Sequence, residues 1–425
     1  MNRALFGAFA ALLFFYSNVA VPANAIFKDG NNSDNIADLQ SDVEYLNKRI
    51  DHLAQKVNTV PSRPNLFNPS ITAFGNFITC LGQAGYPDSA HGLCESPFTF
   101  REAELDIRAV VDPYADAVLI LAFEPTHSHG HDHDHGDEHA GEDSFKAEIE
   151  EAYVTFKKLP FFNSTPLGLL LKAGRFRTPF GRFNQIHLHD LPQLTPVSSL
   201  HAFLGPHGLI RNGFSAQFLI PTAGDNNSMS LTLQILNGGG LAFNPIAQSN
   251  WPAGLAHLSW FWDLEKGHDL EVGLSAYLEH RPGNMSRPVQ LYGVDANYKW
   301  RPFLFGDKHS FLFGGELYGA PKEVKTDTVY KTVFALGGFA FAQYQFDQWT
   351  YFGLRYDYRN LDNNKEGRGH GVGAYLTYYT TEFLRLRIGY EVIGEKYFSK
   401  PSSNLLFEIN FVFGSHPVEP YWVNR

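Results

Sequence analysis

Hydrophobic and polar residues alternate one by one along many short segments between residues 69 and 417. Clear examples are residues 105–111, 352–358, 384–390 and 405–413. Because successive side chains of an extended chain point to opposite faces, each segment has one apolar face and one polar or charged face. The pattern predicts β-strands whose apolar face contacts lipid and whose other face contacts water.

Sixteen segments of this kind occur, and an antiparallel bacterial barrel needs an even number of strands to close. We expect them at about residues 70–81, 97–112, 116–125, 147–158, 167–177, 212–221, 228–238, 253–264, 268–279, 289–300, 308–319, 331–346, 348–359, 369–380, 383–394 and 403–413. Aromatic residues near segment ends, such as Trp260 and Trp349, are typical of the girdles at a membrane interface. The predicted fold class is an all-β membrane protein, a 16-stranded antiparallel outer-membrane β-barrel over residues 69–417.

The connections between the expected strands alternate between short turns and long loops. Residues 265–267 and 381–382 form short turns, whereas residues 82–96 and 239–252 form long loops. Short periplasmic turns and long external loops are typical of barrels in the outer membrane of Gram-negative bacteria. We therefore expect this location and contact with outer-membrane lipid, and we expect residues 418–425 to form a periplasmic tail.

Residues 1–25 predict a signal peptide. Arg3 supplies a positive charge, residues 4–16 form an apolar core, and Ala23-Asn24-Ala25 has the small-x-small pattern of a cleavage site. The apolar core is too short to span a membrane, which argues against a membrane anchor. We therefore expect an exported chain.

Residues 30–62 predict a periplasmic helix with a heptad repeat. Its apolar residues follow spacings of three and four and form one narrow seam: Ile36, Leu39, Val43, Leu46, Ile50, Leu53, Val57 and Val60. Such a seam favours a coiled coil, and we expect it to join three copies of the chain in a trimer. The β-branched residues at the a positions of the heptad, with Leu at the d positions, favour a coiled coil of two helices instead of three. Packing on the chain's own barrel and binding to a periplasmic or cell-wall partner are the alternatives.

The composition excludes other classes of protein. With 34 Lys and Arg against 44 Asp and Glu, the net charge of −10 argues against a nucleic-acid partner. An oxidising compartment allows Cys80 and Cys94 to form a disulfide, the alternative being two reduced thiols. The sequence has no Gly-x-Ser-x-Gly, Cys-x-x-Cys or His-Glu-x-x-His motif and no phosphate-binding glycine loop. We therefore expect no enzymatic activity and no required cofactor.

Several segments resemble known porins. Residues 151–153 (Glu-Ala-Tyr) and 172–181 (Lys-Ala-Gly-Arg-Phe-Arg-Thr-Pro-Phe-Gly) look like the strand-and-turn signature of phosphate-selective-type porins. More closely, four segments resemble outer-membrane proteins often described as zinc-regulated receptors: residues 180–189, 353–358, 382–387 and 413–417. The resemblance covers about residues 69–417 and implies a porin. Energised receptors have 22 strands around a plug, and this sequence has no segment for a plug domain.

The expected external loop at residues 126–146 is rich in histidine and acidic residues. Its candidate metal ligands are His127, His129, His131, His133, His135, His139, Asp132 and Asp134. Neutral imidazoles and carboxylates suit Zn²⁺, Ni²⁺ or Cu²⁺, and a flexible loop can fold several of them onto one ion. We expect zinc to bind in this loop, the alternative being a solvated low-complexity segment with no ligand.

The loop at residues 178–211 is too long for a plain connector. The resemblance implies that it folds into the lumen and narrows it, as the loop at this position does in general porins; a loop folded outside is the alternative. Its candidate pore-constriction residues are Arg182, His187, His189, Asp190, His201, His207 and Arg211. On the polar faces of two strands, Arg355, Asp357, Arg385 and Arg387 are expected to line the lumen.

These observations predict an outer-membrane porin that forms a water-filled channel for passive uptake of small solutes, favouring divalent metal, zinc above all. One alternative is a general or anion- and phosphate-type porin in which metal has no role. The other alternative is a barrel that anchors the cell envelope through its coiled coil. Deletion of residues 30–62 separates the porin functions from the anchor: a porin keeps its conductance, whereas loss of a tether leaves blebbing membranes.

Overall fold

The computed structural model describes residues 69–82, 97–125, 145–159, 166–245, 251–280, 288–302, 306, 308–326, 329–362, 368–395, 402–415 and 420–423. The chain divides into two units, Met1–Leu66 and Phe67–Arg425, and the described residues all belong to the second unit. The predicted signal peptide, the coiled-coil helix with its seam, and the six histidines expected in loop 126–146 therefore lie outside the described residues.

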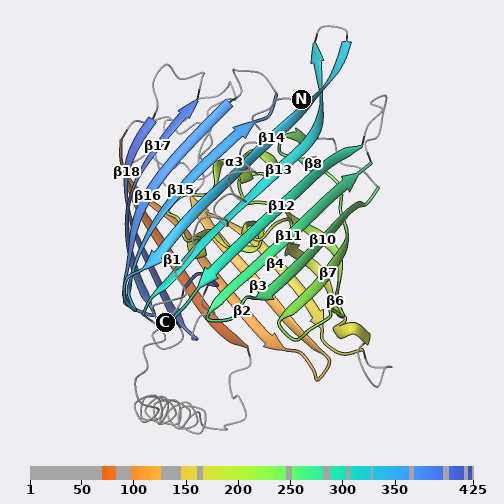
Figure 1. Ribbon diagram of the computed structural model, residues 1–425, viewed down its shortest axis with the longest axis horizontal. Helices are drawn as coiled ribbons and strands as arrows, with labels where there is room; N and C mark the ends of the chain where they lie inside the picture. Colours follow the sequence, from red (N-terminus) through yellow and green to blue (C-terminus); the bar gives the residue numbers. More distant parts are fainter. Residues whose placement is uncertain are drawn as a thin grey trace, which may run out of the picture. The chain divides into compact units, whose positions relative to one another are not determined.

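Sixteen antiparallel strands close into a barrel in which β1 pairs with β18 (Figure 1). They are β1 (Ser70–Gly82), β2 (Phe98–Val110), β3 (Ala115–Pro125), β4 (Phe145–Phe156), β5 (Leu170–Arg177), β6 (Ile210–Ile220), β7 (Asn227–Leu236), β10 (Ala253–Asp263), β11 (His268–Glu279), β12 (Val289–Trp300), β13 (Ser310–Thr326), β14 (Val329–Gln345), β15 (Thr350–Asn360), β16 (Arg368–Thr381), β17 (Leu384–Glu395) and β18 (Ser402–Gly414). Two short strands, β8 (Gly240–Leu241) and β9 (Asn244–Pro245), pair with each other. The predicted fold class, a closed 16-stranded antiparallel barrel, is confirmed.

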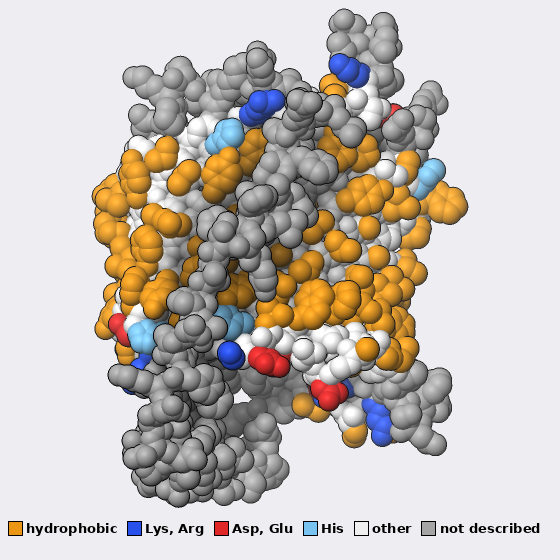
Figure 2. All heavy atoms as spheres, in the orientation of Figure 1, with side chains coloured by type: hydrophobic (Ala, Val, Ile, Leu, Met, Phe, Trp, Pro, Cys, Tyr) orange, Lys and Arg blue, Asp and Glu red, His pale blue; other side chains and the backbone are white. Residues whose placement is uncertain are grey.

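The outer surface of the barrel is apolar over most of its height. In β17, Leu386, Ile388 and Tyr390 are exposed, whereas Arg385 and Arg387 on the opposite face are buried. Figure 2 shows hydrophobic side chains as a broad band on the outer surface, with charged side chains at its lower edge. Because a closed barrel satisfies every backbone hydrogen bond between strands, it can cross lipid, and this architecture belongs to the outer membrane of Gram-negative bacteria.

No helix among the described residues is long and apolar enough to span a membrane.

Short turns join the strands at the lower end of the barrel in Figure 1. In the turn from β14 to β15, the Asp347 carboxylate accepts hydrogen bonds from the backbone N–H groups of Trp349 and Thr350, both at 2.8 Å. In the turn from β2 to β3, Asp112 accepts in the same way from Tyr114 at 2.7 Å. Aspartate at the start of a tight turn supplies the acceptor that the turning backbone needs.

Two β-bulges alter the alternation of side chains in the barrel wall. β2 carries one extra residue, Arg101, relative to β1, and β4 carries one extra residue, Glu150, relative to β3. An extra residue shifts the two-residue period by one position. As a result, Arg101 and Glu102 are both buried on the inner side of the wall, and so are Glu150 and Glu151.

Residues 178–209, called here the inward segment, connect β5 to β6 and lie inside the barrel (Figure 1). The segment contains two 3-10 helices, η2 (Phe183–Gln185) and η3 (Leu188–Asp190), and the helix α3 (Ser198–Leu204). Its apolar side chains form a core with inward residues of the wall; the Phe183 ring lies 4.6 Å from the Phe339 ring, centre to centre. An apolar patch on one side of the interior is therefore covered by the inward segment, which keeps it out of water.

Candidate functional site

The two ends of the inward segment are tied together by one buried amide. Asn184 Nδ2 donates to the carbonyl oxygens of Thr178 at 2.8 Å and Leu209 at 3.1 Å, and Asn184 Oδ1 accepts from the Leu209 N–H at 2.7 Å. Gly208 has a φ of +73°, and a Cβ there would lie 2.4 Å from Asn184 Oδ1. A glycine at this position therefore lets the amide approach the backbone closely.

A buried carboxylate of the wall fixes the first turn of the inward segment. Glu316 Oε1 of β13 accepts hydrogen bonds from the N–H groups of Arg182 at 2.8 Å and Phe183 at 2.7 Å. Gly181, with φ +67°, lies so close that a Cβ would stand 2.4 Å from Glu316 Oε2. The carboxylate thus satisfies donors at the start of η2 that have no partner within the helix.

Four buried arginines of the wall bind backbone carbonyl groups of residues 189–195, and we call them the arginine wall: Arg101, Arg355, Arg385 and Arg387. Arg101 donates to Leu194 O at 2.6 Å, and Arg355 donates to Thr195 O at 2.6 Å. Arg387 donates to Leu191 O at 2.6 Å and Gln193 O at 2.8 Å. Guanidinium groups are suited to this task because they present several fixed donors at once.

Carboxylates balance the charge of the arginine wall. Glu408 of β18 pairs with Arg101 at 3.2 Å, Arg385 at 3.2 Å and Arg387 at 2.6 Å. Asp357 pairs with Arg355 at 2.9 Å. The four residues predicted to line the lumen, Arg355, Asp357, Arg385 and Arg387, therefore face inward but are buried. The three arginines bond backbone groups of the inward segment, and Asp357 pairs with Arg355.

The seven residues expected to constrict the pore do not form one ring, which corrects the prediction of a single selectivity ring. Arg182 pairs with Glu271 of β11 and stacks on the Tyr421 ring at 4.0 Å. Arg211, in β6, donates to Gly240 O at 2.8 Å. His201 and His207 line a separate small hollow. Three short helices divided by extended residues turn successive side chains in different directions, so a continuous ring cannot form.

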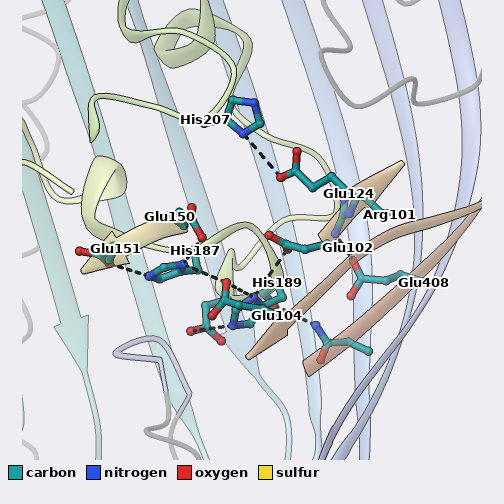
Figure 3. A network of polar contacts seen from close by, with 12 residues as sticks. Arg101, Glu102, Glu104, Glu124, Glu150, Glu151, His187, His189, His207 and Glu408 are labelled. Atoms are coloured by element: carbon teal, nitrogen blue, oxygen red, sulfur yellow. Dashed lines mark hydrogen bonds and ion pairs between the residues drawn. The ribbon is translucent and has the colours of Figure 1, made fainter. Parts of the chain in front are cut away.

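His187, His189 and Asp190 do meet, beside glutamates of β2 and β4. We call Glu102, Glu104, Glu150, His187 and His189 the Glu/His cluster (Figure 3). His187 Nδ1 lies 3.1 Å from Glu104 Oε2 and 3.1 Å from Glu150 Oε2. His189 Nδ1 lies 3.5 Å from Glu104 Oε2 and 3.7 Å from Glu102 Oε2. These residues form two sets of three candidate metal ligands, Glu102–Glu104–His189 and Glu104–Glu150–His187. The three ligand atoms of each set lie within 4.8 Å of one another.

The two histidines of the cluster differ in how their rings are held. His187 Nε2 lies 3.0 Å from Glu151 Oε1, so both of its nitrogens have carboxylate partners. His189 stacks on the Phe74 ring at 4.1 Å, and its Nδ1 has no hydrogen-bond partner. Burial alone would lower the pKa of His187, but the carboxylates, Glu104 foremost, raise it to about 10. For His189 too, Glu104 and its neighbours outweigh burial and raise the pKa.

Two cavities adjoin the Glu/His cluster, and a third adjoins one of these two. The outer hollow, of about 40 Å³, is lined by Glu102, Glu124, Glu150 and His207, toward the long-loop ends of β2 and β3. The inner cavity, of about 300 Å³, is lined by Glu104, His187 and His189 and by charged residues nearer the short turns. The side cavity, of about 370 Å³, extends along the polar faces of β6, β7 and β10. Lys172, Arg177 and Gln185 line both larger cavities, which therefore adjoin each other.

Residues 420–423 pack against the inward segment. Trp422 is buried, its indole N–H donates to Asp190 O at 2.6 Å, and its ring lies 5.9 Å from that of Tyr351. The Tyr421 carbonyl accepts from Lys299 Nζ at 3.0 Å. The sequence predicts only a periplasmic tail here; contacts with the interior were not expected, because a short stretch such as Tyr-Trp-Val has no periodicity from which its packing follows.

The predicted disulfide falls partly within the described residues. No cysteine among them is a free thiol, and Cys80 of β1 is disulfide-bonded. Cys94, the partner expected from the sequence, lies outside the described residues. The pairing of Cys80 with Cys94 stays a prediction.

Sequence reasoning did not assign Glu102, Glu104, Glu150 and Glu151 to a site. A signal for three of them was present in the chain: Arg101-Glu102 and Glu150-Glu151 are adjacent charged pairs within otherwise alternating strands. A regular strand would place one member of each pair in lipid, where a charge is costly. The pairs therefore mark the bulges that direct both members inward.

Comparison with known proteins agrees with the fold. No family model matches the sequence. A protein of Aquifex aeolicus (strain VF5), described as uncharacterized, is 26% identical over 365 residues, which cover 76% of this chain and 70% of that protein.

Three solved structures resemble the barrel. They are the outer membrane channel DcaP of Acinetobacter baumannii (10% identity, 81% of this chain and 96% of that chain, TM-score 0.52), an anion-selective porin from Comamonas acidovorans (12%, 81% and 100%, TM-score 0.50) and OmpF of Salmonella typhi in complex with daunomycin (10%, 81% and 97%, TM-score 0.51). The chain thus has the fold of outer-membrane porins. The finer resemblance to zinc-regulated receptors stays a prediction.

Proposed function

We propose that this protein is an outer-membrane channel for passive diffusion of small solutes, narrowed by the inward segment. One observation carries the proposal: the inward segment packs against one side of the interior and leaves polar cavities of about 300 and 370 Å³ on the other. A barrel of this size without a filling domain contains water, and loops and side chains in the lumen decide what passes.

Divalent metal, zinc above all, is the solute that we propose the channel favours. The Glu/His cluster supports this choice because it lies between the outer hollow and the inner cavity and combines carboxylates with imidazoles. The histidines expected in loop 126–146 would collect metal at the external side. We also propose that the channel is a trimer joined by the N-terminal seam.

Planar-bilayer recordings of the purified, folded protein test this function. We expect single-channel steps, and in a gradient of zinc chloride we expect a reversal potential that reports preference for the cation. Absence of channel activity would contradict the proposal as a whole. Channels that prefer chloride or phosphate would instead support a general or anion-type porin.

A further inference from the structure

The Glu/His cluster contains three buried polar atoms that form no hydrogen bond: Glu102 Oε2, Glu104 Oε2 and His189 Nδ1. Of these, Glu104 Oε2 also has an ion-pair contact, with His187 Nδ1 at 3.1 Å. Their residues are 3%, 3% and 2% exposed, so water does not solvate these side chains freely. A buried polar atom without a partner costs about 1–3 kcal/mol, and more when the group is charged. These same three atoms form the Glu102–Glu104–His189 set, and they point toward one another in Figure 3.

We propose that Glu102, Glu104 and His189 bind one divalent transition-metal ion of the zinc class inside the barrel. This inference rests on the proposed channel function and gives it a defined metal site. A single ion would supply the missing partner of Glu102 Oε2 and His189 Nδ1 and would bind Glu104 Oε2, which His187 also contacts. One imidazole and two carboxylates form a three-ligand set that leaves a fourth position for water or an exchanging ligand, as in open zinc sites.

The spacing of the donor atoms fits this coordination. Zinc lies about 2.0–2.2 Å from imidazole nitrogen and carboxylate oxygen, so two ligands of a tetrahedral ion stand roughly 3.4 Å apart. His189 Nδ1 lies 3.5 Å from Glu104 Oε2 and 3.7 Å from Glu102 Oε2. Small rotations of the side chains are therefore enough to close the set around an ion. An imidazole ligand disfavours Mg²⁺ and Ca²⁺, which prefer oxygen donors only.

The wall and the inward segment hold the three ligands in position. Glu102 and Glu104 lie two residues apart on β2 and therefore share its inward face, and the β2 bulge adds Arg101 to the same face. His189 is fixed by the Phe74 ring on one side and by its own carbonyl, which accepts from Asn410 Nδ2 at 3.2 Å and from Arg385. Ligands on rigid elements with supported backbones define a site more firmly than ligands on a free loop.

The second set of candidate ligands, Glu104–Glu150–His187, already has protein partners. Glu150 pairs with Arg177, and His187 has carboxylate partners at both ring nitrogens. The guanidinium of Arg177 would also repel a cation placed there. We therefore expect one ion per barrel, bound by the Glu102–Glu104–His189 set. Because Glu102 borders the outer hollow and Glu104 and His189 border the inner cavity, an ion at this position can exchange with either side.

Metal binding measured on the folded full-length protein in detergent tests the site without relying on transport. The background is a variant in which the six loop histidines, His127, His129, His131, His133, His135 and His139, are replaced by Gln. Equilibrium dialysis with Zn²⁺ and the visible absorption spectrum of bound Co²⁺ are the two readouts. We expect one ion per barrel and a Co²⁺ spectrum typical of a site of low coordination number with a nitrogen ligand.

His189→Gln in this background should weaken binding at least about tenfold and change the Co²⁺ spectrum. The matched control is His257→Gln, another buried inward histidine, which bonds Ser275 Oγ at 2.9 Å outside the cluster and should leave binding unchanged. If His189→Gln does not fold, as judged by heat-dependent gel mobility, the isosteric Glu102→Gln replaces it and should weaken binding equally.

Failure of the site and failure of the channel are separable. A background variant that conducts but binds no Zn²⁺ would overturn the metal site and leave the channel intact. Equal affinity in the background and in the folded His189→Gln or Glu102→Gln variant would also overturn the site. A protein that binds one ion, loses it in these variants and yet never conducts would support the site and contradict the channel.

Discussion

At the scale of single residues, the shape of the interior depends on a few side chains that bond backbone groups of the inward segment. Asn184→Ala removes three buried hydrogen bonds between its two ends. Each is worth about 1 kcal/mol, and the backbone groups left behind are buried. We expect the segment to loosen and single-channel conductance to rise. Asn226→Ala, in the exposed turn between β6 and β7, is the control. Unchanged conductance in Asn184→Ala would show that other contacts are enough to hold the inward segment in place.

We expect His201 of α3 to make the inward segment sensitive to acid. Burial, together with the positive charges of His207, Arg355 and Arg177, lowers the pKa of His201 from 6.5 to about 3. At a pH between these two pKa values, His201 binds a proton when the inward segment is loosened but not when it is packed. The free energy that favours the packed segment therefore falls as the pH drops below about 6.5. At pH 4.5 this amounts to roughly 2–3 kcal/mol.

Recordings at pH 7 and pH 4.5 test the role of His201. We expect channel noise and mean conductance to rise at pH 4.5 in the parent protein. His201→Gln, which stays neutral and keeps a polar side chain, should reduce this rise. An identical pH response in the two proteins would assign it to other groups.

At the scale of elements, the strands could be predicted from the sequence because lipid on one side and water on the other impose a strict period of two. The hairpin of β13 and β14 is longer than predicted, reaching Thr326 where the prediction ends at residue 319. Its outer part contains Pro321, Lys322 and Glu323, which carry no lipid-facing pattern. This part pairs as regularly as the rest, so backbone hydrogen bonding continues where the apolar pattern stops.

The site could be predicted only in part for a related reason. His187, His189 and Asp190 were recognisable as chemistry-bearing residues of a long loop, but their partners come from two bulged strands far away in the sequence. Periodicity reports which face a residue occupies within one strand. It does not report which side chains of a folded loop meet that face, because those contacts depend on packing between distant segments.

We expect removal of residues 420–423 to widen the opening of the inner cavity at the short-turn end of the barrel. Trp422→Ala deletes the indole that bonds Asp190 O and packs on Tyr351 and Tyr379. Loss of a buried tryptophan costs about 3–5 kcal/mol, more than so short a segment is expected to recover. Single-channel conductance should therefore increase. Trp251→Ala, at an exposed tryptophan, serves as the control. Equal conductance in both variants would mean that these residues lie outside the solute path.

At the scale of the whole molecule, the trimer that we propose would be joined by the seam at residues 36–60, which lies outside the described residues. Eight apolar side chains would be exposed to water in a monomer, at roughly 1.5–3 kcal/mol for each one fully buried. Replacing Leu46 and Ile50 by Asp should dissociate the assembly while the barrel still folds. Analytical ultracentrifugation in detergent measures the mass. Lys48→Asp with Arg49→Asp, two positions off the seam, is the control. A trimer that persists after the seam substitutions would place its interface elsewhere.

The two bulges also determine how the inward residues of this barrel could be copied into another barrel. A regular strand offers an inward position only at every second residue, so copying the adjacent pairs Arg101–Glu102 and Glu150–Glu151 onto an unbulged barrel would turn one charge of each pair toward lipid. Grafting the cluster together with its supporting residues Arg101 and Glu151 into another 16-stranded scaffold would therefore require a one-residue insertion in each of two strands, at the places of Arg101 and Glu150. Protein engineers would have to transfer a backbone irregularity together with the side chains.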